Sequence, residues 1–310
     1  SVRAPVGEVG KTAYDVVLGR GVAAIRGNDF LLQTLLKLKE CKYWGKVSAG
    51  STFDSITSEI LKSTLISMPA IEEQIKIGDF LSSVDKLITL HQRKLEALKK
   101  LKRTLLQKMF PKKGHLKPEL RFFGFTNDWE QRKLNEIASI YDGTHQTPRY
   151  TSNGIPFLSV ENITTLQSSK FISEKDFLRD FPVYPKKGDV LLTRIGDVGT
   201  ANVYERNQKV AFYVSLALLK LRETDPYFVN ASFRSNSTRK EVWKRTLHIA
   251  FPKKINKNEI GKVNIQIPSL AEQRKIGIFF YSLDRLITLH QRKLEIYKKL
   301  KKGLLQKMFI

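Results

Sequence analysis

Residues 71–110 read IEEQIKIGDFLSSVDKLITLHQRKLEALKKLKRTLLQKMF, and residues 270–309 read LAEQRKIGIFFYSLDRLITLHQRKLEIYKKLKKGLLQKMF. At this offset of 199 residues, 28 of the 40 positions are identical. The similarity continues weakly upstream, where Pro69 and Pro268 precede the two stretches and Val9-Gly10 is similar to Val198-Gly199. The chain therefore contains an internal duplication that is longer than the repeated stretch itself.

The two copies of the duplication differ in length. Residues 111–309 form a copy of 199 residues, whereas residues 1–110 form one of 110, a difference of 89. We therefore expect residues 1–69 to be a partial first module that lacks its N-terminal half, and residues 122–268 to be a complete second module. Residues 70–110 and 269–310 are the two repeated helices, and residues 111–121, with two prolines and a glycine, are a linker.

Apolar residues recur within each repeated stretch at alternating steps of four and three, with Lys, Arg and Glu elsewhere. This heptad-like spacing is typical of a coiled coil. A helix of roughly 35 residues is about 50 Å long, which is longer than one small domain covers. An amphipathic helix packed on its own domain is the alternative, but we predict that the two helices pair antiparallel. The predicted seam consists of Ile77, Leu81, Val84, Ile88, His91, Leu95, Leu98, Leu105, Ile276, Phe280, Leu283, Ile287, His290, Leu294, Tyr297 and Leu304.

His91 and His290 occupy the same position of the seam in the two copies. A polar side chain in a seam commonly fixes the register of the helices at some cost in stability. A metal site or a pH switch is the alternative. The five histidines lack the spacing of zinc ligands, so we expect no metal site.

The charge of the chain is strongly positive, with 54 Lys and Arg against 30 Asp and Glu, a formal net charge of +24. Such a field attracts polyanions, so nucleic acid is the first partner to consider and an anionic membrane surface the second. No apolar run approaches the roughly 18 residues of a membrane span, and no signal-peptide pattern opens the chain. The single cysteine, Cys41, excludes an internal disulfide framework and fits a reducing cytoplasm.

The second module mixes short apolar runs at residues 155–160 and 190–193 with Gly-containing turn signals. A helical stretch is expected at residues 227–246. These features indicate an α/β module with a mainly antiparallel or mixed sheet, so the fold class is α/β, with mixed-sheet modules joined by two long antiparallel helices.

The loop at residues 141–150, YDGTHQTPRY, combines aromatic, hydroxyl, amide and cationic groups that suit contacts with bases and phosphates. An ordinary solvated loop explains the same letters. The candidate DNA-binding residues of this loop are Thr144, His145, Gln146, Thr147, Arg149 and Tyr150.

A second candidate follows the strand at residues 190–193, where Thr193 and Arg194 precede a glycine and could bring a guanidinium to a phosphate. A structural ion pair of Arg194 with Asp197 or Asp189 explains these letters equally well. We expect replacement of Arg149 or Arg194 by Ala to weaken DNA binding and to leave folding intact. The basic pairs of the module are most simply solvated surface when taken singly, but together they suggest a phosphate-tracking face. They are Lys186-Lys187, Arg239-Lys240, Lys244-Arg245 and Lys253-Lys254.

Two E-Q-x-K-I-G segments, at residues 73–78 and 272–277, each follow a proline and precede D-[KR]-LITLHQRKLE and LLQKMF. This combination resembles the conserved helical region of specificity subunits of type I restriction–modification systems. The segment around Leu120-Arg121-Phe122, with Trp129 and Lys133-Leu134, resembles the start of a target recognition domain of that family. Residues 3–10 and 19–23 resemble the middle of such a domain. The resemblance covers the whole chain and is most specific in the helices.

The resemblance implies a sequence-specific DNA-binding subunit that reads a bipartite site in double-stranded DNA, one half per recognition domain. It implies two methyltransferase subunits as partners, and restriction subunits bound through them. S-adenosylmethionine, ATP and Mg would belong to those partners, and this chain would hold no cofactor and be no enzyme. The chain departs from the family pattern in its short first domain, which puts recognition of that half-site in doubt.

Enzyme motifs are absent from the sequence. It has neither the glycine-rich cofactor loop with an Asn/Asp-Pro-Pro site of a DNA methyltransferase nor a Walker A loop, and its acidic residues form no nuclease-like cluster around a Lys. We therefore expect no catalytic residue. A coiled-coil adaptor without sequence-specific DNA binding and a nuclease acting alone are the alternatives.

Overall fold

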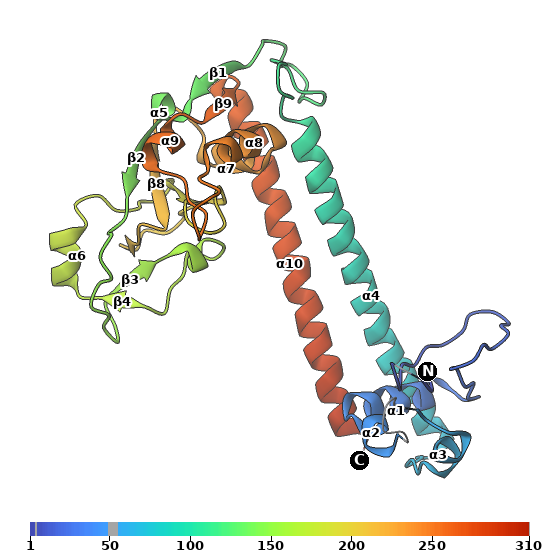
Figure 1. The fold of residues 1–310 in the computed structure, drawn as a ribbon. Helices are drawn as coiled ribbons and strands as arrows, with labels where there is room; N and C mark the ends of the chain where they lie inside the picture. Colours follow the sequence, from blue (N-terminus) through green and yellow to red (C-terminus); the bar gives the residue numbers. More distant parts are fainter. Residues whose placement is uncertain (4, 49–54, 310) are drawn as a thin grey trace. The chain divides into compact units, whose positions relative to one another are not determined.

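The computed structural model describes residues 1–3, 5–48 and 55–309, and it divides the chain into two compact units. Unit 1 comprises residues 1–97 and 287–310, and unit 2 comprises residues 98–286. Helices α4 (Ile71–Lys108) and α10 (Leu270–Met308) each contribute to both units (Figure 1). One mixed and two antiparallel sheets accompany these long helices, so the expected α/β class is confirmed.

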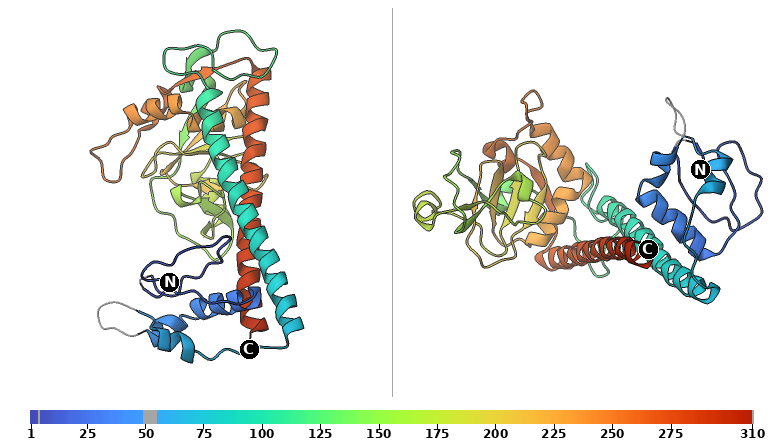
Figure 2. Two further views of the ribbon diagram at one scale, coloured as in Figure 1. Left: turned by 90° about the vertical axis from the view of Figure 1, so that its right-hand side faces the viewer. Right: turned by 90° about the horizontal axis from the view of Figure 1, so that it is seen from below.

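Within each unit, α4 and α10 lie side by side and run in opposite directions (Figure 1, Figure 2). In unit 1, Lys301 Nζ lies 2.6 Å from Asp85 Oδ1, and His91 faces His290. In unit 2, Lys102 forms an ion pair with Asp284. Residue numbers that rise along one helix meet numbers that fall along the other, as the predicted antiparallel pairing requires.

The residues of the predicted seam are all buried or half-buried; Leu81, for example, is 0% exposed. The last turn of each helix departs from the predicted spacing. There Leu106 and Leu305 are buried, whereas the predicted Leu105 and Leu304 are half-buried. Leu106 packs in one apolar cluster with Trp129 of the second module, and Leu305 packs in another with Phe30. At these helix ends, neighbouring segments therefore bury a position one residue beyond the predicted seam.

Unit 1 also holds three short helices, α1 (Asp29–Glu40), α2 (Tyr43–Val47) and α3 (Ser58–Ser63). The side chain of Asn28 caps α1 by accepting a hydrogen bond from the amide of Leu31 at 3.1 Å. Phe30 of α1 stacks on Phe309 with ring centroids 4.9 Å apart, next to Leu81 and Leu305. This apolar cluster joins α1 to both long helices.

Unit 2 contains nine short strands within the described residues. They are β1 (Glu130–Lys133), β2 (Ala138–Asp142), β3 (Ile155–Leu158), β4 (Phe171–Ile172), β5 (Val190–Thr193), β6 (Ala201–Val203), β7 (Ala211–Phe212), β8 (Leu216–Leu221) and β9 (Asn264–Ile267). The strands form sheets of order β1-β9, β2-β8-β5-β6 and β4-β3-β7. Only the β3–β7 pair is parallel among them, so the module is mixed, as predicted.

Strand β5 lies at the centre of the module and is buried along its whole length. Its alternate residues face opposite sides of the sheet. Val190 and Leu192 pack in the cluster with Phe228 of α7 (Pro226–Arg234), whereas Leu191 packs with Leu158 of β3. Helix α7 and the sheet thus form two layers around the first cluster, and the second cluster lies on the opposite face of β5.

The remaining helices of unit 2 are α5 (Leu134–Ile137), the 3-10 turn η1 (Val160–Asn162), α6 (Glu174–Asp180), α8 (Asn236–Arg245) and α9 (Lys257–Gly261). The single helical stretch predicted for residues 227–246 is wrong in one respect, because it consists of two helices. Ser235 ends α7 in an extended conformation and caps α8, its Oγ accepting a hydrogen bond from Thr238 N at 3.3 Å. Serine favours such caps over helix interiors.

The E-Q pair of the second repeat anchors the module to α10. Glu272 is fully buried and accepts two hydrogen bonds of 2.7 Å from the guanidinium of Arg121. The Gln273 side chain donates to Pro268 O at 2.9 Å and accepts from Asp225 N at 3.0 Å, which ties the start of α7 to the start of α10. The packing of α7 and of the Arg121 segment against the start of α10 therefore explains the Glu-Gln pair of the repeated motif.

The first repeat uses the same device in unit 1. The Gln74 side chain donates to Pro69 O at 2.8 Å and accepts from Asn28 Nδ2 at 2.9 Å, just before α1. Gly78 allows the close approach of α1, because a Cβ there would lie 2.7 Å from Phe30 N. Helix α1 is thus the counterpart of α7.

The upstream equivalence between the copies differs from the one inferred from sequence. The similarity of Val9-Gly10 to Val198-Gly199 suggested that Gly10 is equivalent to Gly199. In the structure, the counterpart of Gly199 is Gly7. Gly7 N donates to Ser1 O at 3.0 Å, Gly199 N donates to Thr193 O at 2.9 Å, and both glycines have positive φ, 83° and 96°. A matching dipeptide is too short to fix an alignment, whereas a six-residue turn with the same hydrogen bond does fix it.

No helix among the described residues is long and apolar enough to cross a membrane.

Candidate nucleic-acid interface

Arg194 follows β5 directly and is held inside the module. The residue is 8% exposed, its Nη1 forms an ion pair with Asp142, and its Nε lies 3.3 Å from Ile255 O. The structure therefore favours the ion-pair interpretation of Arg194 over the phosphate contact. The carboxylate partner is Asp142, not Asp197 or Asp189. Thr193 is likewise fully buried and hydrogen-bonds Thr200, so it is not available to DNA.

The loop at residues 141–150 presents most of its predicted side chains to solvent. Thr144 is half-buried, and its backbone amide donates to Phe212 O at 3.1 Å. Tyr150 is 43% exposed and its ring packs edge-on against Phe157. The side chains that this loop exposes are His145, Gln146, Thr147, Arg149 and Tyr150.

Two of the four basic pairs expected to follow phosphates, Lys186-Lys187 and Lys253-Lys254, are exposed, but they lie in different surroundings. Lys186 and Lys187 occupy a turn in which the amide of Lys186 donates to Asp189 Oδ2 at 2.8 Å. Lys254 is bridged to Ile195, next to the buried Arg194. Because Arg194 also contacts Asp142, the structure links the 141–150 loop, the end of β5 and Lys253-Lys254 into one region.

The segment from Leu247 to Lys254, which we term the 247–254 loop, was not predicted as a site apart from its two lysines. Leu247 N donates to Lys254 O at 2.7 Å and closes the loop. Ile249 and Phe251 project from it almost fully exposed, at 98% and 105%. The sequence signal that could have identified this loop is the run Ile-Ala-Phe-Pro between His248 and Lys253, which interrupts an otherwise basic stretch.

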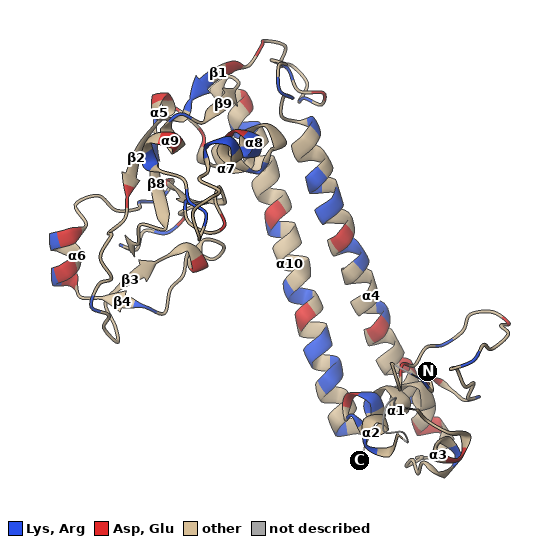
Figure 3. Ribbon diagram, in the orientation of Figure 1, with Lys and Arg blue, Asp and Glu red and all other residues tan. Residues whose placement is uncertain are grey.

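A hollow of about 320 Å³ lies beside the 247–254 loop. Its lining includes Arg239 and Trp243 of α8, His248 and Lys253 of the loop, and Asp197. Figure 3 shows Lys and Arg on α8, as well as along α4 and α10. Of the α8 cations, Lys244 and Arg245 are engaged by a carboxylate, whereas Arg239 is exposed with no ion pair in the part of the chain that the structure describes.

That carboxylate is Glu241. Burial opposes ionisation of Glu241, but the hydrogen bond from Lys244 and the charge of Arg245 lower its pKa overall. Lys244 Nζ and Arg245 Nη1 lie 3.0 and 2.9 Å from its two oxygens. Glu241 thus offsets part of the charge of Lys244 and Arg245, whereas Arg239 and Lys240 of the same helix have no ion pair in the part of the chain that the structure describes.

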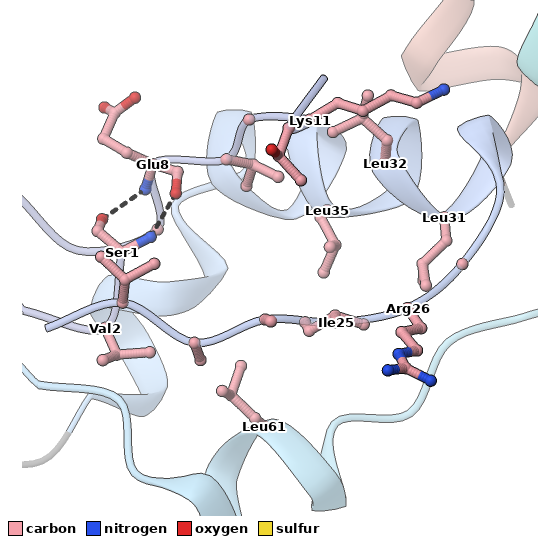
Figure 4. A pocket seen from close by; sticks show the side chains of 18 of the residues that line it. Ser1, Val2, Glu8, Lys11, Ile25, Arg26, Leu31, Leu32, Leu35 and Leu61 are labelled. Atoms are coloured by element: carbon pink, nitrogen blue, oxygen red, sulfur yellow. Dashed lines mark hydrogen bonds between the residues drawn. The ribbon is translucent and has the colours of Figure 1, made fainter. Parts of the chain in front are cut away.

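A second hollow, of about 570 Å³, lies in unit 1 and is lined mainly by apolar side chains (Figure 4). Leu31 and Leu35 of α1 border it. On α7, the counterpart of α1, Val229 and Phe233 are covered and buried. The two copies therefore share the helix but differ in what covers it.

The described residues contain no cluster of three or more His, Cys, Asp or Glu side chains that could hold a metal ion. His91 and His290 instead meet in unit 1, with their Nδ1 atoms 2.9 Å apart, and His91 stacks on Tyr297. Desolvation, with help from Lys94, lowers the pKa of His290. The pair fills the seam with one shared hydrogen bond, since one Nδ1 donates and the other accepts.

The basic loops that this mixed-sheet module exposes beside the paired helices are features that suit a DNA-recognition protein. The profile of one family, described as the type I restriction modification DNA specificity domain, matches residues 1–100 and 126–298. The chain belongs to this family, whose members confer DNA sequence specificity and are generally non-catalytic.

Relatives and solved structures agree with this assignment. The type I restriction enzyme MjaVIII specificity subunit of Methanocaldococcus jannaschii is 26% identical over 296 residues, which cover 90% of this chain and 68% of that protein. The MjaIX specificity subunit of the same organism is 30% identical over 189 residues, 56% of this chain and 44% of that protein.

Two solved structures share the fold. The type I restriction–modification S subunit from M. genitalium has a TM-score of 0.64 at 17% identity and covers 91% of this chain and 72% of its own. The HsdS subunit from Thermoanaerobacter tengcongensis has a TM-score of 0.52 at 22% identity and covers 91% of this chain and 69% of its own.

Proposed function

We propose that this chain is the specificity subunit of a type I restriction–modification complex and reads a bipartite site in duplex DNA. The observation that carries the proposal is the family match over residues 1–100 and 126–298. The duplication supports a bipartite site, because each copy supplies a repeated helix and the counterpart helix, α1 or α7, that packs on it.

The two copies within the chain are similar in their long helices and different in their modules, which supports two different half-sites. The repeated helices are identical at 28 of 40 positions, whereas the module sequences differ. Readers of different half-sites must differ in the side chains that they present to base edges, but spacers need not differ. A stiff helical pair also fixes the spacing of two readers better than a flexible linker does.

Two methyltransferase subunits are the proposed partners, with restriction subunits bound through them. S-adenosylmethionine, ATP and Mg are proposed to act in those partner subunits, and this chain would position the DNA for them. We place the complex in the cytoplasm, where the single exposed thiol, Cys41, would stay reduced.

The test is a gel-shift titration of the full chain on a random duplex library, at several salt concentrations and with or without a type I methyltransferase subunit. We expect enrichment of particular duplexes and an affinity that falls as salt rises, by a slope of about 0.9 per phosphate neutralised. An adaptor would select no sequence. Metal-dependent cleavage by the purified chain would point instead to a nuclease.

A matched pair of variants locates the binding surface. Arg149→Gln removes an exposed cation of the 141–150 loop, whereas Arg179→Gln removes an exposed cation that is already paired with Asp180 on α6. We expect the first to weaken binding and the second to leave it unchanged. Equal effects would show that only the total charge matters.

A further inference from the structure

The 247–254 loop combines exposed apolar side chains with a fixed backbone. Ile249 and Phe251 are 98% and 105% exposed. Both ends of the loop are held, because Leu247 N donates to Lys254 O at 2.7 Å and Gly196 N donates to Lys253 O at 2.8 Å. Large apolar groups on a well-anchored loop are typical of an interaction site.

The start of the loop is also fixed to α8. The His248 ring lies 4.4 Å from the Trp243 ring, centroid to centroid, and His248 Nε2 lies 2.8 Å from Trp243 O. These two contacts hold His248 against α8, so they also fix the position from which the next residue, Ile249, projects.

The charges around the tip favour a polyanion over a protein surface. Lys253, Lys254 and Arg239 are exposed at its base, and Lys253 and Arg239 line the same hollow. One acidic side chain, Asp197, also lines this hollow, and it accepts a hydrogen bond from Thr200 Oγ1 at 2.7 Å. An apolar tip with cations at its base matches a nucleic-acid groove, which has bases at its floor and phosphates along its edges.

We propose that the 247–254 loop is a wedge that inserts Ile249 and Phe251 into a groove of duplex DNA. Lys253, Lys254 and Arg239 bond the phosphates that border the groove. Phosphate contacts position a protein, whereas contacts with the bases specify the sequence. Apolar side chains that enter the minor groove insert between base steps, unstack them and kink the duplex, and the cost of this deformation depends on the sequence. This inference rests on the proposed DNA-reading function and assigns part of it to named residues.

The corresponding segment of the first copy differs in the expected way. The anchor is shared, because Ile56 N donates to Val2 O and Ile255 N donates to Arg194 O, both at 2.9 Å. Asp54 and Ser55 align with Lys253 and Lys254 at the offset of 199, and Gly50 aligns with Ile249. Residues 49–54 lie outside the described part of the chain. A shared anchor combined with a divergent sequence is what two readers of different half-sites require.

The test compares two variants of the full chain on a duplex that the wild-type chain selects from the random library and on a scrambled duplex of the same length. For Ile249→Ala/Phe251→Ala we expect affinity for the selected duplex to fall roughly ten- to a hundredfold, with little change on the scrambled one. For Lys253→Gln/Lys254→Gln we expect weaker binding to both duplexes and a salt slope reduced by about 2.

The control variant is Phe123→Ala, which removes a side chain that is 101% exposed and does not line the hollow. We expect this variant to bind like the wild type. Circular dichroism of all variants checks the fold, and Phe251→Leu, which keeps an apolar tip, is expected to restore most of the affinity.

The outcomes separate the inference from the proposed function. If the wild-type chain selects a duplex and Ile249→Ala/Phe251→Ala binds it equally well, the wedge is wrong and the proposed function stands. Failure of the wild-type chain to select any duplex removes both. Undiminished DNA selectivity combined with lost binding of the methyltransferase subunit would assign the tip to a protein interface and overturn the wedge.

Discussion

The close approach of α7 to α10 predicts opposite effects for two Gly-to-Ala substitutions in the same helix. A Cβ on Gly277 would collide with Asp225 Oδ1 and lie 2.8 Å from Phe228 N. These two atoms form the N-terminal cap of α7, with a hydrogen bond of 2.8 Å. A Cβ on Gly303 would meet no atom within 4 Å. The two sites therefore differ in packing while sharing the helical backbone.

The expected magnitudes follow from this difference. Alanine in place of glycine inside a helix stabilises by up to about 1 kcal/mol, which applies to both sites. At Gly277 this gain is opposed by overpacking, about 1–3 kcal/mol, and by loss of the α7 cap, about 1 kcal/mol. We expect Gly303→Ala to raise the free energy of unfolding by about 0.5–1 kcal/mol, and Gly277→Ala to lower it by about 1–3 kcal/mol.

Urea denaturation followed by circular dichroism and by tryptophan fluorescence measures both variants. The signal of Trp129 reports on unit 2, because this side chain is 1% exposed and packs against Phe228. If Gly277→Ala proves as stable as Gly303→Ala, then α7 does not pack on α10 as described, and the explanation of the E-Q-x-K-I-G motif fails with it.

Two further predictions concern charged and titratable groups. Arg194→Ala is expected to lower the free energy of unfolding by about 1–3 kcal/mol, because it leaves the carboxylate of Asp142 without its guanidinium partner. The control, Arg149→Ala, should leave thermal stability unchanged. Equal melting temperatures of the two variants would contradict the structural role of Arg194. Protonation of His290 is disfavoured in the folded chain, so stability should be complete above the ordinary pKa of 6.5 and fall as the pH drops below it. In the double variant His91→Leu/His290→Leu, the melting temperature should no longer fall with pH between pH 8 and 5. If it falls as in the wild type, the histidine pair is not the cause of the pH dependence.

Local and periodic features of the fold could be predicted from the sequence. The heptad-like spacing and its repetition at an offset of 199 specified two long helices and their antiparallel pairing. The apolar run at residues 190–193 specified a buried strand, because alternation is lost when both faces of a sheet are covered. These predictions depend on side chains close together in sequence, where burial imposes a regular spacing.

Long-range partners could not be predicted in this way. Arg194 pairs with Asp142, which is 52 residues away, rather than with the nearby Asp197 or Asp189. This partner is fixed by the pairing of both β2 and β5 with β8, a property of the whole sheet. The sequence therefore left a phosphate contact and a structural ion pair as alternatives for Arg194, and the sheet places its guanidinium against Asp142.

The family, the α/β class and the helical pairing were determined by the sequence alone, because the repeated motif and its spacing are written in consecutive letters. The tertiary structure decided which basic and apolar side chains reach the surface. Thr193 and Arg194 are buried, whereas Ile249 and Phe251 project from a closed loop. Exposure depends on the packing of distant segments against one another, and no local pattern of residues encodes it.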